Sequence, residues 1–288
     1  MNYLYCIAIL VVIYALLSEG LNLIIGHGGI FSMGHGAFFA VGAYVSALLY
    51  TRVGMAFPLE LLMSALAAML CGLMLSLAAM RLKGDYITFC SYGFAIVVYT
   101  VANNWLDVTN GPTGISGIMR PTVFGLSFTT LPQYLLLCLM VAAISFLVMY
   151  RVVHSPYGKS IEAFREDEAA AYASGINVAL RKTQVFCIGA FFAGLAGCLY
   201  AHYMMICDPT SFKISVSSLL VCMVIIGGMG SMLGAVAGAI IVIGLPELLT
   251  FLGLSGSYSE QIQDMIYSLL LIVIIVNRPR GLFGKLKF

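Results

Sequence analysis

Charged residues are scarce in this chain, and their scarcity decides its broad class. Only 9% of the 288 residues are Asp, Glu, Lys or Arg, whereas 61% are hydrophobic. A soluble domain carries roughly 25% charged residues. The shortfall argues against an ordinary soluble domain and predicts that most of the chain lies in lipid. The net charge of +2 gives no indication of a nucleic-acid partner, and we expect none.

Paired cysteines and a nucleotide-binding loop are also missing. The eight cysteines form no C-x-x-C pair and mostly fall inside apolar runs, so we interpret them as small buried hydrophobic residues. The four histidines show no metal-binding spacing, and no catalytic cluster is evident. The phosphate-binding pattern G-x-x-x-x-G-K-[ST] does not occur. We therefore expect no metal, no cofactor and no enzyme activity, and any ATP that drives this protein must be bound by another chain.

What the chain has in abundance is long apolar runs. A helix needs about 20 mostly apolar residues to cross the hydrocarbon. The runs are continuous, whereas β-barrel strands would be shorter and alternating. The expected fold is therefore all-α, a single polytopic membrane domain over residues 1–288 with about nine transmembrane or re-entrant helices. The candidates are Leu4–Ile25, Ser32–Tyr50, Pro58–Met80, Tyr86–Trp105, Leu131–Tyr150, Thr183–Met204, Ile214–Ile226 (too short to span alone), Met232–Phe251 and Ile262–Val276.

Basic residues predict the orientation of these spans. Eleven of the 14 Lys and Arg residues follow the third, fifth and ninth spans, and only Arg52, Arg120 and Lys213 fall on the other side. Loops rich in Lys and Arg stay in the cytoplasm. We therefore expect the 151–182 loop and the C-terminus in the cytoplasm and the N-terminus outside.

Two glycine clusters in different halves of the chain resemble each other. One follows Leu23 and contains Gly26, His27, Gly34 and His35, and the other follows Val224 and contains Gly227, Gly228 and Gly230. Gly-interrupted helices in matching halves are typical of a transport pathway. Small residues also allow close helix packing without any such role. Both interpretations stay open, and these glycines and histidines are our tentative pathway residues.

The longest polar stretch, residues 151–182, is predicted to fold into two short helices. Ser155 can cap a first helix that begins with Pro156, and Asp167 can cap a second from Glu168 to Ser174. Gly175 occupies the place of a left-handed C-terminal cap. Ile161 and Phe164 share one face of the first helix, and we expect this apolar face to be an exposed docking surface.

The second of these helices carries a recognisable motif. Residues 165–177 resemble the Glu-Ala-Ala…Gly coupling loop of ABC importer permeases, in the form found in branched-chain amino acid permeases of the LivM type. The resemblance covers nearly the whole chain. One departure is Ala235, near which the family pattern has a proline. The other matching segments are Gly26–Tyr44, Lys83–Tyr86, Asn103–Trp105, Thr109–Ile115, Gly227–Ser231 and Arg278–Gly284.

The resemblance implies a subunit of an importer that carries branched-chain amino acids into the cytoplasm across the bacterial plasma (inner) membrane. Such importers combine a pair of permease subunits, two cytoplasmic ABC ATPases that bind the ATP, and a periplasmic or extracellular substrate-binding protein. Glu168, Ala169 and Gly175 fall on the coupling motif, and Arg165 and Asp167 lie beside it. The family pattern also includes the outer loop Gly111, Pro112, Thr113 and Gly114.

Two acidic residues inside apolar runs leave other functions open. Glu19 and Glu247 are candidates for intramembrane charges, which are functional sites by default. They would serve as ion sites if the chain were an ion-coupled secondary transporter. The alternative is that both lie near an interface or pair with a polar neighbour. Permeases for urea, amides or other amino acids share this architecture, and a membrane scaffold or membrane enzyme without a transport role is a third alternative.

Overall fold

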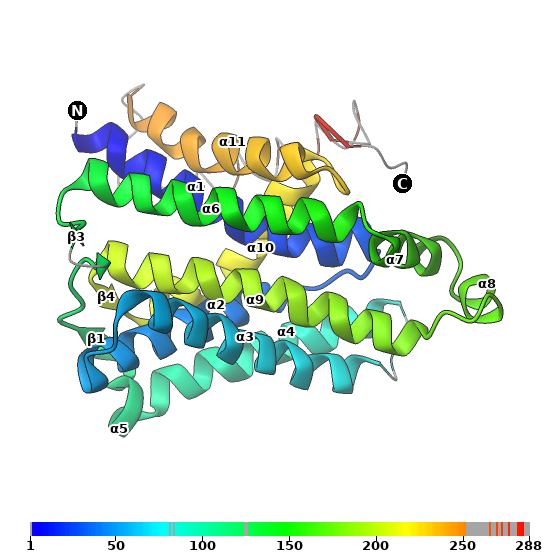
Figure 1. Cartoon of the computed structure of the whole chain (residues 1–288), viewed down its shortest axis with the longest axis horizontal. Coiled ribbons are helices and arrows are strands. Elements are labelled where there is room, and N and C mark those ends of the chain that lie inside the picture. Colours follow the sequence, from blue (N-terminus) through cyan, green and yellow to red (C-terminus); the bar gives the residue numbers. More distant parts are fainter. Residues whose placement is uncertain are drawn as a thin grey trace.

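In the computed structural model, long helices lie side by side and their connections gather at the two ends of the bundle (Figure 1). Lipid offers no hydrogen bonds to the backbone, so helices that satisfy their own N–H and C=O groups are the stable way to span it. The structure describes residues 2–80, 82, 84–123, 126–251, 265, 269, 272, 276 and 281–284, without the side chains of residues 2, 126–127 and 245–251.

Six helical segments among the described residues are long and apolar enough to cross a membrane. They confirm an all-α membrane fold and correspond to the first six expected spans. The count of about nine is not confirmed, because α10 (Ile214–Gly227) is short and the ninth candidate lies almost entirely outside the described residues. The eighth candidate is α11 (Met232–Phe251). The six segments are α1 (Asn2–Asn22) with the π-helical turn η1 (Leu23–His27), α2 (His35–Leu48) with η2 (Leu49–Val53), α3 (Phe57–Ala79), α4 (Asp85–Asn104), α6 (Leu131–Val153) and α9 (Val178–Met204).

The second expected span starts later than predicted, because α2 begins at His35. The N–H of Met33 donates to Ser91 Oγ on α4 over 3.0 Å, and the N–H of Gly36 donates to Ser217 Oγ on α10 over 3.1 Å. The first N–H groups of a helix have no partner within it. Ser217 supplies such a partner to Gly36, the second residue of α2, and Ser91 binds Met33 just before the helix, so α2 begins inside the bundle.

Helix α9 forms the centre of the bundle. In the most apolar stretch of α9, 83% of the residues are buried, whereas in that of α6 only 22% are buried. A Cβ atom on Gly194 would lie 2.7 Å from Cα of Ala65 on α3, and one on Gly42 of α2 would lie 2.6 Å from Cα of Gly194. Glycine at these positions lets three helices approach closely. Leu136 and Leu147 of α6, by contrast, are exposed on the surface of the bundle.

The two ends of the bundle differ in structure. One end, here the coupling end, carries α7 (Pro156–Glu166) and α8 (Glu168–Ala173) (Figure 1). The other, here the strand end, carries the N-terminus and short elements that close the connections. These are α5 (Leu106–Thr109), η3 (Gly111–Thr113), η4 (Pro209–Phe212), the antiparallel pair β1 (Ile115–Ser116) and β4 (Ile206–Cys207), and the antiparallel pair β2 (Thr122–Val123) and β3 (Leu126–Ser127).

Candidate functional site

Helices α7 and α8 form the connection between α6 and α9, and their ends are capped as predicted. Ser155 Oγ accepts a hydrogen bond from the N–H of Gly158, and Asp167 Oδ1 accepts from the N–H groups of Ala169 (2.8 Å) and Ala170 (3.1 Å). Gly175 has φ +82° and open space around it, so its backbone conformation is what favours glycine. These caps stabilise two short helices that would be marginal alone.

Helix α8 is the more exposed of the two helices. Tyr172 is 77% exposed, and Ala169, Ala170 and Ala173 are exposed as well. Glu168 forms an ion pair with Lys182 at the start of α9, which holds the first turn of α8 against the bundle. An alanine-rich helix with one projecting tyrosine is therefore presented to the solvent at the coupling end.

The apolar face of α7 is not a docking surface, and that expectation was wrong. Ile161 and Phe164 share a face as predicted, but they are 0% and 2% exposed. They belong to the buried core and attach α7 to the bundle. Tyr157 adds to this attachment, because the Arg181 guanidinium of α9 lies 4.9 Å from the centre of its ring. Burial raises the pKa of Tyr157 to about 12, and Arg181 opposes that rise.

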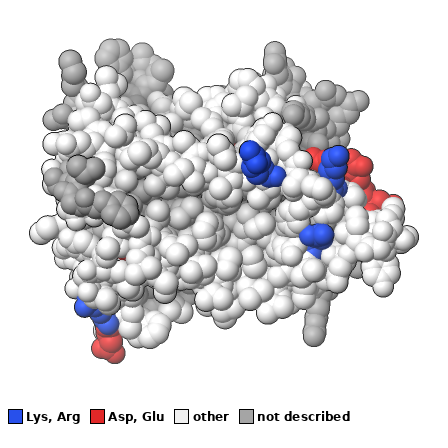
Figure 2. Space-filling model, in the orientation of Figure 1, with Lys and Arg blue, Asp and Glu red and all other residues white. Residues whose placement is uncertain are grey.

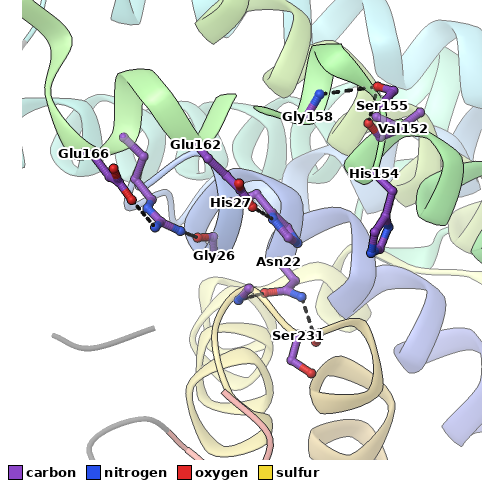
Figure 3. Close-up of polar contacts among 12 residues, drawn as sticks. Asn22, Gly26, His27, Val152, His154, Ser155, Gly158, Glu162, Glu166 and Ser231 are labelled. Atoms are coloured by element: carbon purple, nitrogen blue, oxygen red, sulfur yellow. Dashed lines mark hydrogen bonds and ion pairs between the residues drawn. The ribbon is translucent and has the colours of Figure 1, made fainter. Parts of the chain in front are cut away.

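Arg165 connects α7 to the first glycine cluster. Its Nη1 donates a hydrogen bond to the carbonyl oxygen of Gly26 over 3.1 Å, and its side chain is 18% exposed. Gly29 has φ +64°, and a Cβ there would lie 2.4 Å from Cγ of Arg165. Glu166 lies 3.8 Å from the guanidinium (Figure 3). The Arg165 stem therefore packs directly on the glycine-rich backbone that leads from α1 to α2.

A second contact joins α7 to the same segment. Glu162 Oε1 lies 3.9 Å from His27 Nδ1, and Figure 3 shows the two side chains pointing toward each other. The histidine is nearly buried and the glutamate is half exposed. A cavity of about 830 Å³ opens beside this pair and is also lined by His154, Gly230 and Ser231.

The two glycine clusters meet around Asn22, a residue that the sequence analysis did not single out. Asn22 is buried, accepts a hydrogen bond from the N–H of Gly230 (2.9 Å) and donates one to the carbonyl of Ser231 (3.0 Å; Figure 3). A Cβ on Gly26 would lie 2.3 Å from both Asn22 Oδ1 and the nitrogen of Gly230. A lone amide in an apolar helix was the available signal, since buried amides need partners.

The remaining glycines of the second cluster pack against the end of the described chain. Gly228 has φ +114°, and a Cβ there would lie 2.2 Å from the nitrogen of Gly284. The carbonyl of Gly227 accepts a hydrogen bond from the N–H of Phe283 over 2.9 Å. Gly227, Gly228 and Gly230 thus lie together at the coupling end with Gly26 and His27.

Gly34 and His35 lie apart from this group. His35 is 1% exposed, and its Nε2 lies 3.0 Å from the carbonyl oxygen of Leu17 in the middle of α1. A Cβ on Gly34 would lie 3.2 Å from the carbonyl oxygen of Ser91. Both residues form the buried start of α2, so the structure divides the tentative pathway residues into two places.

The outer loop lies at the strand end, far from α8 (Figure 1). Gly111 and Gly114 are buried with φ +57° and +68°, whereas Pro112 and Thr113 are exposed. A Cβ on Gly114 would lie 2.4 Å from the carbonyl oxygen of Cys207. The loop is therefore a packed turn whose exposed tip is residues 112–113.

Only one of the two intramembrane acids can be placed. Glu19 is 2% exposed in α1, and its Oε2 has no hydrogen-bond partner among the described residues. Glu247 lies on α11, but its side chain is outside the described part of the structure. The two are therefore not shown to form a common site.

Comparison with known proteins matches nearly the whole chain. A family model described as "Branched-chain amino acid transport system / permease component" matches residues 3–275. The high-affinity branched-chain amino acid transport system permease protein LivM of Escherichia coli (strain K12) is 33% identical, over 96% of this chain and 69% of that protein. The corresponding LivH of Salmonella typhimurium is 24% identical over 94% of this chain and 91% of LivH. No solved structure gives a significant match.

Proposed function

The chain belongs to the family of branched-chain amino acid transport permeases, and from this membership we propose that it moves small apolar amino acids inward as the membrane subunit of an ATP-driven importer. The relatives named LivM and LivH are permease proteins of branched-chain amino acid transport systems. A pathway for such a cargo needs few charges, which agrees with the 9% charged content.

The proposed assembly supplies what this chain lacks. The printed sequence contains no phosphate-binding loop, so two separate ATPase subunits would bind and hydrolyse ATP. A second permease subunit would complete the membrane pathway, and a substrate-binding protein would deliver the amino acid at the strand end. The exposed leucines of α6 offer one surface on which a second permease subunit or lipid would pack.

The observation that carries the proposal is the attachment of α8 through α7 to the glycine clusters. Helix α8 is exposed and capped, while one face of α7 is buried against the bundle and Arg165 binds Gly26. A partner that grips α8 would move α7 as a rigid body and with it the backbone between α1 and α2. Rigid-body movement of one element against another is a common way in which a conformational change in one subunit is transmitted to its neighbour.

The coupling end, which carries α7 and α8, has the basic residues expected of a cytoplasmic surface. Figure 2 shows most of the charged side chains visible on this face at the coupling end. Arg52 and Arg120 lie instead at the strand end, where both are bonded to backbone carbonyls. We therefore place α8 in the cytoplasm and the strand end outside the plasma (inner) membrane.

Reconstitution into liposomes tests this function. Liposomes that contain the chain, its ATPase subunits, the second permease subunit and the binding protein should accumulate leucine only when ATP is supplied. An ionophore that collapses the ion gradients should not stop this uptake. Uptake that needs no ATP and collapses with the ion gradient would contradict the proposal and favour an ion-coupled carrier using Glu19. Uptake of urea or an amide in place of leucine would correct the cargo alone.

A further inference from the structure

Three buried side chains of the kinds that bind metal ions lie together near the strand end, away from α7 and α8. Glu60 occupies the first turn of α3, and Cys198 and His202 lie four residues apart in the last turns of α9. One donor atom from each side chain lies within 4.8 Å of the other two, and all three residues are 0% exposed. Residues at i and i+4 share one helical face, so α9 presents sulfur and nitrogen together toward α3.

The hydrogen bonds of His202 identify which of its nitrogens faces the carboxylate of Glu60. Its Nδ1 lies 2.6 Å from the carbonyl oxygen of Met119, and a carbonyl can only accept, so Nδ1 carries the hydrogen. Nε2 lies 2.7 Å from Glu60 Oε1. In neutral histidine, two electron pairs would then face each other, so a proton lies between these two atoms at hydrogen-bond distance, and a bound metal cation would displace it. Histidine ligands commonly donate their other ring N–H to a backbone carbonyl in this way.

The other polar groups around the cluster are incompletely bonded. Ser46 of α2 donates to Glu60 Oε1, and its Oγ lies 3.4 Å from Cys198 Sγ. Glu60 Oε2 is buried without a hydrogen-bond partner among the described residues, and so is Ser64 Oγ. Leaving a buried carboxylate oxygen unbonded is costly. A divalent ion bound through both carboxylate oxygens of Glu60 would satisfy Oε2 as well.

A cavity adjoins two of the three side chains of the cluster. A cavity of about 680 Å³ at the strand end is lined by Glu60 and His202 together with Tyr50, Met119 and Thr122. A metal site requires suitable ligands, an outer hydrogen-bond partner and a route for the ion. The first two are present in the cluster, and the cavity reaches two of its three side chains.

We infer that Glu60, Cys198 and His202 form a site for a divalent transition-metal ion, with Zn²⁺ the ion that best fits one oxygen, one nitrogen and one sulfur ligand. Zn²⁺ takes this mixture in tetrahedral sites, with Ser46 or a water as the fourth ligand. Magnesium and calcium prefer oxygen alone. A bound ion would tie the outer end of α3 to α9 and, through the carbonyl of Met119, to the outer connection.

Metal analysis of the purified full-length chain, with any partner subunits that co-purify, tests the site. After equilibration with Zn²⁺ and removal of free ion, about one ion per chain should remain. His202→Gln and Cys198→Ser should weaken binding by at least roughly tenfold. Cys187→Ser, on the same helix but outside the cluster, should leave binding unchanged.

Cobalt substitution shows whether the bound ion contacts the thiolate. The Co²⁺ form of the unsubstituted chain should display a sulfur-to-metal charge-transfer band that Cys198→Ser abolishes and Cys187→Ser retains. The metal-free thermal transition of each variant, compared with that of the parent, shows whether the substituted chain is folded. No retained ion, or equal retention by the folded parent and variants, would overturn the inference.

Discussion

The Arg165 guanidinium of α7 donates a hydrogen bond to the carbonyl oxygen of Gly26 across 139 positions of sequence. This contact joins the helix pair at the coupling end to the first glycine cluster of the membrane bundle. Asn22 then joins Gly26 to the second glycine cluster at Gly230. Along this chain of contacts, movement of α8 would reach the transmembrane helices.

Arg165→Ala tests the first contact in that route. A hydrogen bond from a charged donor contributes about 1.5–3 kcal/mol, and its loss should loosen α7 from the backbone at Gly26. We expect ATP-driven uptake to fall at least roughly tenfold, the factor that about 1.4 kcal/mol represents, while ATP hydrolysis persists. Lys159→Ala removes an exposed positive charge from the same helix and should leave uptake near normal. Equal loss of uptake in both variants would contradict the role of Arg165.

Gly26→Ala tests the meeting of the glycine clusters. The added Cβ would lie 2.3 Å from Asn22 Oδ1 and from the Gly230 nitrogen, so the two clusters must separate. Overpacking of this kind costs typically 1–3 kcal/mol. We expect a lower thermal transition in detergent together with loss of uptake.

A matched variant controls for the substitution itself. Gly93 lies in α4 with nothing within 4 Å of a Cβ at that position. Gly93→Ala should therefore be neutral or slightly stabilising, because alanine favours the helix by about 1 kcal/mol over glycine. A thermal transition for Gly26→Ala as high as that of Gly93→Ala would show that the clusters do not touch.

Coupling of ATP hydrolysis to uptake should depend on the caps of α8 and on the small side chains of its exposed face. Gly175→Pro cannot adopt φ +82° and removes the N–H that bonds to Tyr172 over 3.0 Å. Ala169→Glu places bulk and charge on an exposed helix face. Both should uncouple ATP hydrolysis from uptake while membrane insertion survives, measured as ATP consumed per leucine imported.

Gly54→Pro offers the control for backbone strain, because Gly54 has φ +64° and open space at the strand end. It should not raise the ATP consumed per amino acid, whatever its effect on the amount of folded protein. Unchanged coupling in both the Gly175 and the Ala169 variants would remove α8 from the mechanism.

Local features of the coupling end could be predicted from the sequence because they depend on a few consecutive residues. The caps at Ser155 and Asp167 and the left-handed Gly175 follow from side-chain reach and glycine's backbone freedom. The face shared by Ile161 and Phe164 was also predictable. What covers that face was not, because periodicity does not say whether another element or solvent lies against it.

Contacts between segments far apart in the chain could not be predicted, because periodicity shows which residues share a face but not what packs against that face. Glu60 and His202 are separated by 142 positions, and only the spacing of Cys198 and His202 hinted at a shared face. The resemblance between the two glycine clusters left a pathway and close packing as open interpretations, and it did not predict that Asn22 joins the clusters. It also did not predict that Gly34 and His35 lie deeper in the bundle than Gly26.

Site-directed cross-linking from α8 tests the central claim most directly. A cysteine at the 77% exposed position of Tyr172, in the assembled complex, should cross-link to the ATPase subunit and resist membrane-impermeant thiol reagents added to intact cells. A cysteine at the exposed Thr113 of the strand end should instead react with the reagents added outside and should not cross-link to the ATPase subunit. Labelling of position 172 from outside the cell, with no cross-link to the ATPase, would contradict the account.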